Sequence, residues 1–135
     1  MANAVGPDHV ATTDVIERAC KRAVVTSSAE QARFVLETVG ARTATAAVGL
    51  RDARAVRGWA RGQRIKQSDA QQRLQELYQV VWAVTEAYSP AVAAAFLRGT
   101  NPHLGDRAPL VVLAEGPPDK AGPALLAAAR RLIED

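Results

Sequence analysis

Positively charged side chains gather in one short stretch of this sequence, and they are the residues with the clearest chemistry. Residues 42–66 contain seven cations and a single carboxylate, Asp52. Arginine binds phosphate oxygens, and it also binds the O6 and N7 atoms of guanine through two hydrogen bonds. The stretch therefore predicts a DNA-binding surface. The candidate DNA-binding residues are Arg51, Arg54, Arg57, Arg61, Arg64 and Lys66.

The distribution of charge along the chain favours the same interpretation. The formal net charge is only +3, but residues 1–66 hold eleven Lys and Arg residues and six Asp and Glu residues. Residues 67–135 hold six and eight, so the first half is basic and the second is slightly acidic. A basic half of this kind is the electrostatic footprint expected of a phosphate-binding face. Charge alone leaves open the alternative of a solvated surface without a ligand.

Residues that could perform catalysis or bind a metal are few. A nucleophilic or acid–base site needs a reactive group beside an orienting partner. Beyond scattered carboxylates the chain offers only His9, His103 and Cys20. A lone cysteine on a helix is more often a small buried residue than a nucleophile, and His103 next to Asp106 fits a turn. No spacing resembles a metal site, so we expect a protein that is not an enzyme, with no catalytic or metal-binding residues and no cofactor.

The sequence also bears on the compartment. It has one cysteine, no basic-then-apolar run at its start, and no apolar stretch near the roughly 18 residues that a membrane span needs. We therefore expect a cytoplasmic protein without a membrane role.

Short helices are predicted to position the cations. About two turns of small side chains in residues 43–48 lead to Gly49, which can adopt the left-handed conformation of a sharp turn. Asp52 can cap a second helix that runs to about residue 60. On this helix Val56 and Trp59 are expected to face inward, which leaves the arginines outside. The pattern is typical of a helix-turn-helix, which lays its second helix in the major groove of DNA.

The remaining sequence also has helical spacing, so the expected fold class is all-α, with a helix-turn-helix domain followed by a small C-terminal helical bundle. After a mobile lead-in of about a dozen residues, a short helix is expected from Asp14. The longest helix is expected over residues 69–88, where Trp82 is either a core residue or part of a dimer surface. A chain break at residues 116–123 is expected before the last helix. The expected division is 1–26 for the lead-in and short helix, 27–66 for the helix-turn-helix domain and 67–135 for the second helical domain.

The second half contains a motif that resembles a known family. The string FLRGTNPHLGDRAPLVVLAEG, residues 96–116, is similar to the toxin-binding domain of the Xre/MbcA/ParS-type antitoxins, which features Asn-Pro-x-Leu-Gly, then Pro-Leu, then Leu and Gly. That family places an Xre-like helix-turn-helix upstream, and residues 36–62 look like this domain. The motif positions are Asn101, Pro102, Leu104, Gly105, Pro109, Leu110, Leu113 and Gly116.

The resemblance implies an antitoxin of a type II toxin–antitoxin system. The implied partner is a cognate RES-domain toxin that consumes NAD and is inhibited by the C-terminal region of the antitoxin. The implied second activity is repression of its own operon, and reading a palindromic operator would require a homodimer. The candidate toxin-binding residues are Asn101, Leu104, Arg130, Arg131, Leu132, Ile133, Glu134 and Asp135.

Three alternatives stay open at this level. The apolar face of the last helix either docks into the toxin or packs on the longest helix of the chain, and both can hold for different residues. The same domains would also suit a stand-alone transcriptional regulator without a toxin partner. A helical adaptor whose arginines contact protein or RNA is the third alternative, and it predicts a weak salt dependence of DNA binding.

Overall fold

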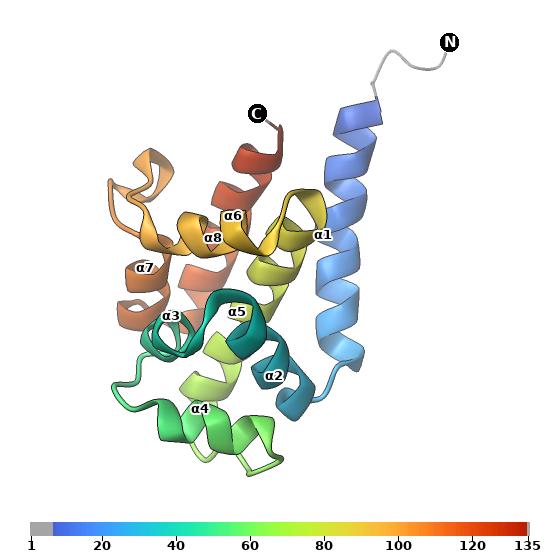
Figure 1. Ribbon diagram of the computed structural model, residues 1–135. Coiled ribbons are helices and arrows are strands. Elements are labelled where there is room, and N and C mark those ends of the chain that lie inside the picture. Colours follow the sequence, from blue (N-terminus) through green and yellow to red (C-terminus); the bar gives the residue numbers. More distant parts are fainter. Residues whose placement is uncertain (1–6, 135) are drawn as a thin grey trace.

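Between residues 7 and 134 the chain forms eight α-helices and a short 3-10 helix (Figure 1). The computed structural model describes the backbone of these residues and the side chains of residues 14–134. No β-strand occurs in this part of the chain, which confirms the predicted all-α class. The elements are α1 (Pro7–Val25), α2 (Ser28–Val39), α3 (Ala41–Ala47), α4 (Ala53–Ala60), α5 (Ser68–Ala87), α6 (Pro90–Arg98), η2 (Pro102–Leu104), α7 (Pro109–Glu115) and α8 (Pro118–Glu134).

The long helix α5 lies at the centre, and most of the other helices pack around it (Figure 1). Its residues Leu74, Leu77 and Val81 have no exposed surface, because α1, α2, α6 and α8 cover it on different sides. A helix with apolar residues on most of its circumference must be buried in this way. The core runs from Val15 on α1 to Ala129 on α8, so the segments predicted as separate domains share one hydrophobic core.

The first helix begins earlier than the sequence pattern predicts. It starts at Pro7 rather than at Asp14, and proline suits a first helical turn because its missing N–H needs no partner there. Asp14 is therefore not a cap; its carboxylate pairs with Arg18 one turn later, at 2.9 Å. The predicted lead-in is wrong from residue 7 onward, while residues 1–6 lie outside the described part of the chain. His9 is on α1, and its side chain also lies outside the described residues.

Trp82 is a core residue and does not form part of an exposed surface. Only 8% of it is accessible to solvent, and the guanidinium groups of Arg18 and Arg22 lie 5.4 Å and 5.1 Å from its ring centre. Cations at this distance from an indole face are attracted by the ring quadrupole. The two arginines therefore attach α1 to α5 and cover the ring that the sequence left open as a dimer surface.

The junction between α1 and α2 is closed by polar side chains. Ser27 accepts a hydrogen bond from the Glu30 N–H at 3.1 Å, and Glu30 accepts one from the Ser27 N–H at 3.3 Å, which makes a capping box. Gln31 is 4% exposed and donates to the Ala23 carbonyl at 3.0 Å. Because these bonds satisfy the end of one helix and the start of the next, the angle between α1 and α2 is well defined.

The last helix is longer than predicted. It begins at Pro118 and continues through Pro123, so the expected chain break does not extend beyond residue 117. Pro118 occupies the first turn, where proline is tolerated, and Pro123 leaves one carbonyl of that turn without its helical donor. Leu125 is fully buried in the core, whereas Leu132 and Ile133 are only half-buried. The inner part of α8 thus packs on α5, as one of the two alternatives predicted.

A carboxylate lies between α5 and α8, where water reaches it poorly. Glu76 is so close to α8 that a Cβ atom on Gly122 would collide with its carboxyl group, so a larger residue at position 122 would force the Glu76 side chain to move. Its Oε1 atom is buried with no hydrogen-bond partner among the described residues. Burial raises the pKa of Glu76 to about 7, although a hydrogen bond from Gln72 and the charge of Arg73 act in the opposite direction.

This carboxylate is expected to make the fold less stable as the pH rises. Glu76 is neutral in both states below its ordinary pKa of 4.5, so its contribution to stability is complete there and is lost as the pH rises through about 7. We expect Glu76→Gln to raise the free energy of unfolding by about 1 kcal/mol at pH near 8, after allowing for solvent screening, and to change it little at pH near 5. Urea unfolding at both pH values measures this. Glu37→Gln, on the exposed side of α2, is the matched control, and an equal effect of both substitutions would contradict the assignment.

Candidate nucleic-acid interface

The turn between α3 and α4 has the features that the sequence predicts. Gly49 has a φ of 81°, and the Leu50 N–H donates to the Thr45 carbonyl at 3.1 Å. A Cβ atom at position 49 would lie 3.4 Å from the Ala114 carbonyl oxygen, so the turn also packs closely against α7. Asp52 caps α4 by accepting the Arg54 N–H at 2.9 Å. These contacts fix where α4 begins and how it leaves the turn.

The inner face of α4 is apolar, as predicted. Val56 has no exposed surface and Trp59 is 5% exposed, and the helix packs against α2 and α3. The other end of α4 is held by Arg33 of α2, which donates to the Ala60 carbonyl at 2.8 Å. Charge-assisted capping of this kind is favourable at a helix C-terminus. The sequence did not single out Arg33, because its partner is a backbone carbonyl 27 residues away.

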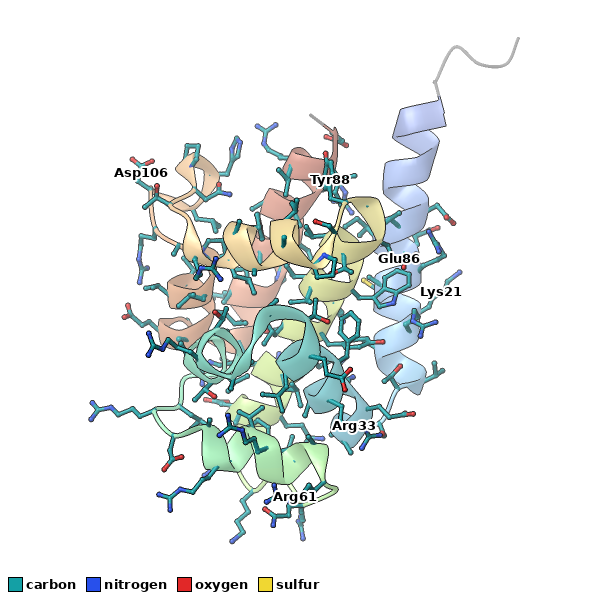
Figure 2. The ribbon with its side chains drawn as sticks, viewed as in Figure 1. Lys21, Arg33, Arg61, Glu86, Tyr88 and Asp106 are labelled. Atoms are coloured by element: carbon teal, nitrogen blue, oxygen red, sulfur yellow. The ribbon has the colours of Figure 1, made fainter. Side chains whose placement is uncertain are left out.

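The outer face of α4 and the loop that follows it carry the predicted cations, and all of them are exposed. Figure 2 shows one of them, Arg61, at the end of the molecule where α4 lies. The structure thus brings the candidate DNA-binding residues into one region. Arg51 precedes α4, Arg54 and Arg57 are on it, Arg61 ends it, and Arg64 and Lys66 follow in the loop of residues 61–67.

One of these cations is neutralised within the chain. The Nε and Nη2 atoms of Arg54 donate to the same Asp52 oxygen at 2.8 Å and 2.6 Å. The side-chain hydrogen bonds from Arg54 hold the pKa of the Asp52 carboxyl below its ordinary value. Because the pair has no net charge, Arg54 adds less to the attraction of phosphates than Arg57 or Arg61, which form no ion pair with the described residues.

The Asn-Pro motif forms a compact turn at the other end of the molecule. Asn101 accepts the His103 N–H at 2.9 Å, and Gly105 has a φ of 67°, as a left-handed turn residue requires. The Asn101 N–H donates to the Arg107 carbonyl at 3.2 Å, and Arg107 pairs with Glu115 at 2.6 Å. These bonds define the shape of the turn, and the side-chain oxygen of Asn101 is bound within the turn itself.

A groove of about 480 Å³ lies between this turn and α8. Alanines form much of its lining, and exposed polar and charged residues border it. Among the candidate toxin-binding residues, Arg130, Arg131 and Glu134 line it, Leu104 is half-buried in the turn nearby, and Asp135 lies outside the described residues. The lining residues are His103, Ala124, Ala127, Ala128, Arg130, Arg131 and Glu134.

The two candidate surfaces, at α4 and at the groove on α8, lie at opposite ends of the folded molecule. Figure 1 places α4 at one end and the C-terminus with the η2 turn at the other, and Figure 2 shows Arg61 far from Asp106 and Tyr88. Helix α5 runs between them and contacts α2 on one side and α8 on the other. A macromolecule bound at one end would therefore leave the other end accessible.

The described part of the chain shows neither a metal site nor a membrane-spanning helix. Within it, no group of three or more His, Cys, Asp or Glu side chains is placed to hold a metal ion. No described helix combines the length and apolar character needed to cross a membrane. Comparison of the chain with protein-family models, with curated proteins and with solved structures gave no match.

Proposed function

We propose that this protein is an antitoxin that binds operator DNA through α4 and the loop of residues 61–67 and inhibits a RES-domain, NAD-consuming toxin through its C-terminal end. The observation that carries the proposal is the separation of the basic surface from the Asn-Pro turn and the end of α8 (Figure 2). If the toxin modulates the DNA affinity of the antitoxin, both must be able to bind the same chain, and two distant surfaces on one core allow this.

The DNA-binding part of the proposal is supported by the two faces of α4. Its apolar residues are buried against α2, and its uncompensated cations are exposed together with those of the following loop. A second helix with a buried apolar side and an exposed basic side is what insertion into a DNA groove requires. Arginines on such a helix bind phosphates or guanine edges, so they supply both affinity and a route to specificity.

The toxin-binding part is supported by the motif and by the surface beside it. The motif residues form the turn that borders the groove on α8, and the exposed cations Arg130 and Arg131 stand at the edge of an alanine-lined floor. The small side chains leave room for an apolar side chain of a partner, and the arginines can pair with its carboxylates. Leu132 and Ile133, at the end of the same helix, are half-buried and pack against the core, next to the groove-lining Arg131 and Glu134 in the sequence.

The test is the NAD consumption of a RES-domain toxin encoded beside this chain. We expect the full chain to stop NAD loss at equimolar concentration, and a variant without residues 132–135 to leave it unchanged. This truncation removes the hydrogen bond from the Tyr88 hydroxyl to the Leu132 carbonyl and the half-buried side chains of Leu132 and Ile133, but the fully buried Leu125 and Ala129 keep α8 in the core, so the helical bundle should persist. Far-ultraviolet circular dichroism of the truncated chain checks that it does.

Point variants localise the contact more sharply than the truncation. The double variant Arg130→Glu and Arg131→Glu is expected to lose inhibition, whereas Arg98→Glu and Lys120→Glu, which change the net charge equally on other exposed surfaces, should retain it. No inhibition by the full chain would refute the antitoxin function. If the same chain still bound DNA, a stand-alone regulator would then be the better account.

A further inference from the structure

A second groove, beside the end of α4, suggests how far the DNA interface extends. We propose that this groove receives a backbone phosphate of the bound duplex, so that the start of α2 and the first turns of α5 are part of the interface. The inference rests on the DNA binding proposed above, and it adds the start of α2 and the first turns of α5 to the cations Arg64 and Lys66 that the sequence already indicates. The volume of the groove is about 590 Å³. The lining residues are Ser27, Ser28, Ala29, Gly62, Gln63, Arg64, Ile65, Lys66, Ser68 and Gln71.

The charge of the groove suits an anion. Arg64 and Lys66 line it, and no carboxylate is among its lining residues. Two carboxylates are close by but outside the lining: Glu30 is bound to the Ser27 N–H and hydroxyl in the capping box at the edge of the groove, and Asp69 lines a neighbouring hollow that shares Ser68 with it. An anion in the groove would therefore meet two cations without a competing negative charge in its wall.

Neutral donors complete the lining. The hydroxyls of Ser28 and Ser68 and the amides of Gln63 and Gln71 are exposed or half-exposed around the two cations. Hydroxyl and amide side chains are common partners of DNA phosphate oxygens, together with Arg and Lys. The floor is Ile65, which is 8% exposed and anchors the loop to the core, so the cations on either side of it project from a fixed backbone.

The position of the groove favours a phosphate of DNA over a free anion. Gly62 and Gln63 line the groove directly after Arg61, the last residue of the α4 region, so the groove continues the exposed cationic face. All its charged groups are exposed, and salt screens a single small anion at such a site. A duplex presents many phosphates at once and releases condensed counterions, which gives the additional free energy that an isolated phosphate lacks.

The decisive variant adds a negative charge inside the groove without disturbing the helix. Gln71→Glu does this on α5, where glutamine and glutamate have similar helix propensities. Gln75→Glu, one turn further along the same helix and exposed outside the groove, is the matched control with the same net charge. The probe is a duplex of about 30 base pairs from the region upstream of the gene, titrated at several salt concentrations.

We expect Gln71→Glu to weaken duplex binding about 5- to 10-fold near 0.1 M salt and to reduce the salt dependence by about one counterion, and Gln75→Glu to change affinity less than about twofold. Equal effects of the two substitutions would overturn the groove assignment while leaving DNA binding itself intact. A wild-type chain that does not bind the duplex would instead refute the proposed function. Competition by millimolar inorganic phosphate at constant ionic strength would also overturn the proposal, because it would identify a site for free anions.

Discussion

Replacing Arg57, Arg61 and Arg64 together with glutamine is expected to weaken duplex binding about 100- to 1,000-fold near 0.1 M salt. Each cation that neutralises a phosphate releases condensed counterions, and the loss of one such contact costs roughly a factor of eight at this salt concentration. All three side chains are exposed and make no ion pair among the described residues, so their removal should not destabilise the fold. The measurement is a titration of labelled duplex at several salt concentrations, in which the slope should fall by about three counterions.

A matched triple variant separates this effect from a general loss of charge. Lys21→Gln, Arg98→Gln and Lys120→Gln remove the same charge from α1, α6 and α8, where the side chains are also exposed. This variant should bind DNA within about threefold of the wild type, since only long-range attraction is reduced. Equal losses in the two triple variants would show that net charge, and not α4, determines binding, and would refute the proposed interface.

Arg54 provides an internal comparison for the same experiment. Its guanidinium is bound to the Asp52 carboxylate through two hydrogen bonds, so its charge is already compensated. Removing Arg54 alone would also free the negative charge of Asp52 beside the start of α4. The sequence assigned Arg54 and Arg57 the same role, and only the geometry of the cap distinguishes them.

The local features of the fold were predictable because local rules govern them. Gly49 at a positive φ, Asp52 as a helix cap, and Val56 with Trp59 on the inner face of α4 follow from residue preferences over a few positions. The internal hydrogen bond of Asn101 also follows from the tendency of short polar side chains to bond their own backbone. Predictions of this kind need no knowledge of distant parts of the chain.

The errors in the predicted helix ends arose at prolines, because proline can either end a helix or begin one. Proline ends a helix when it lies in the interior, but it is favourable in the first turn. Pro7 and Pro118 both occupy first turns, so the helices begin at residues that the sequence analysis assigned to a lead-in and to a chain break. For α8, packing decides between these two roles, because Pro118, Ala121 and Gly122 in its first turns are buried.

Contacts over long sequence separations were beyond prediction for a different reason. Arg33 binds the Ala60 carbonyl, and Arg18 lies over the Trp82 ring. In the sequence each arginine is one more exposed cation on a helix, and nothing nearby marks its partner. A backbone carbonyl has no residue-type signature, so such pairs emerge only when the helices are packed.

Arg73→Met is expected to lower the free energy of unfolding by about 3 kcal/mol, the largest single-residue effect on stability that the polar contacts of this fold predict. The Nε atom of Arg73 donates to the Leu113 carbonyl at 2.9 Å, and its Nη2 atom donates to the Gly116 carbonyl at 3.0 Å. Both bonds are partly buried, and methionine fills the volume of the stem without a donor. The last turn of α7 would then lose the partner of two carbonyl groups.

The same substitution should make the loss of stability depend on pH. Arg73 lowers the pKa of Glu76, so without it the ionised Glu76 carboxylate is held even less favourably between α5 and α8. The difference between Arg73→Met and the wild type is therefore expected to be larger at pH near 8 than at pH near 5, where Glu76 is largely protonated in the folded chain. Arg73→Lys, which retains the charge but not the paired donors, should show the same pH dependence as the wild type while remaining less stable than it.

Urea unfolding of Arg73→Met, Arg73→Lys and the surface control Arg98→Met measures these differences directly. Arg73 also lies against the turn at Gly49, where its Nη1 atom is 3.6 Å from the position of a Cβ, so one side chain joins α5, the end of α7 and the turn before α4. Leu113 and Gly116 belong to the Asn-Pro motif of the proposed toxin-binding region, and Gly49 belongs to the turn before the proposed DNA-binding helix. A midpoint for Arg73→Met equal to that of Arg98→Met would mean that these hydrogen bonds contribute nothing to the fold, and that apolar packing and the direct contact of α3 with α7 hold this junction together.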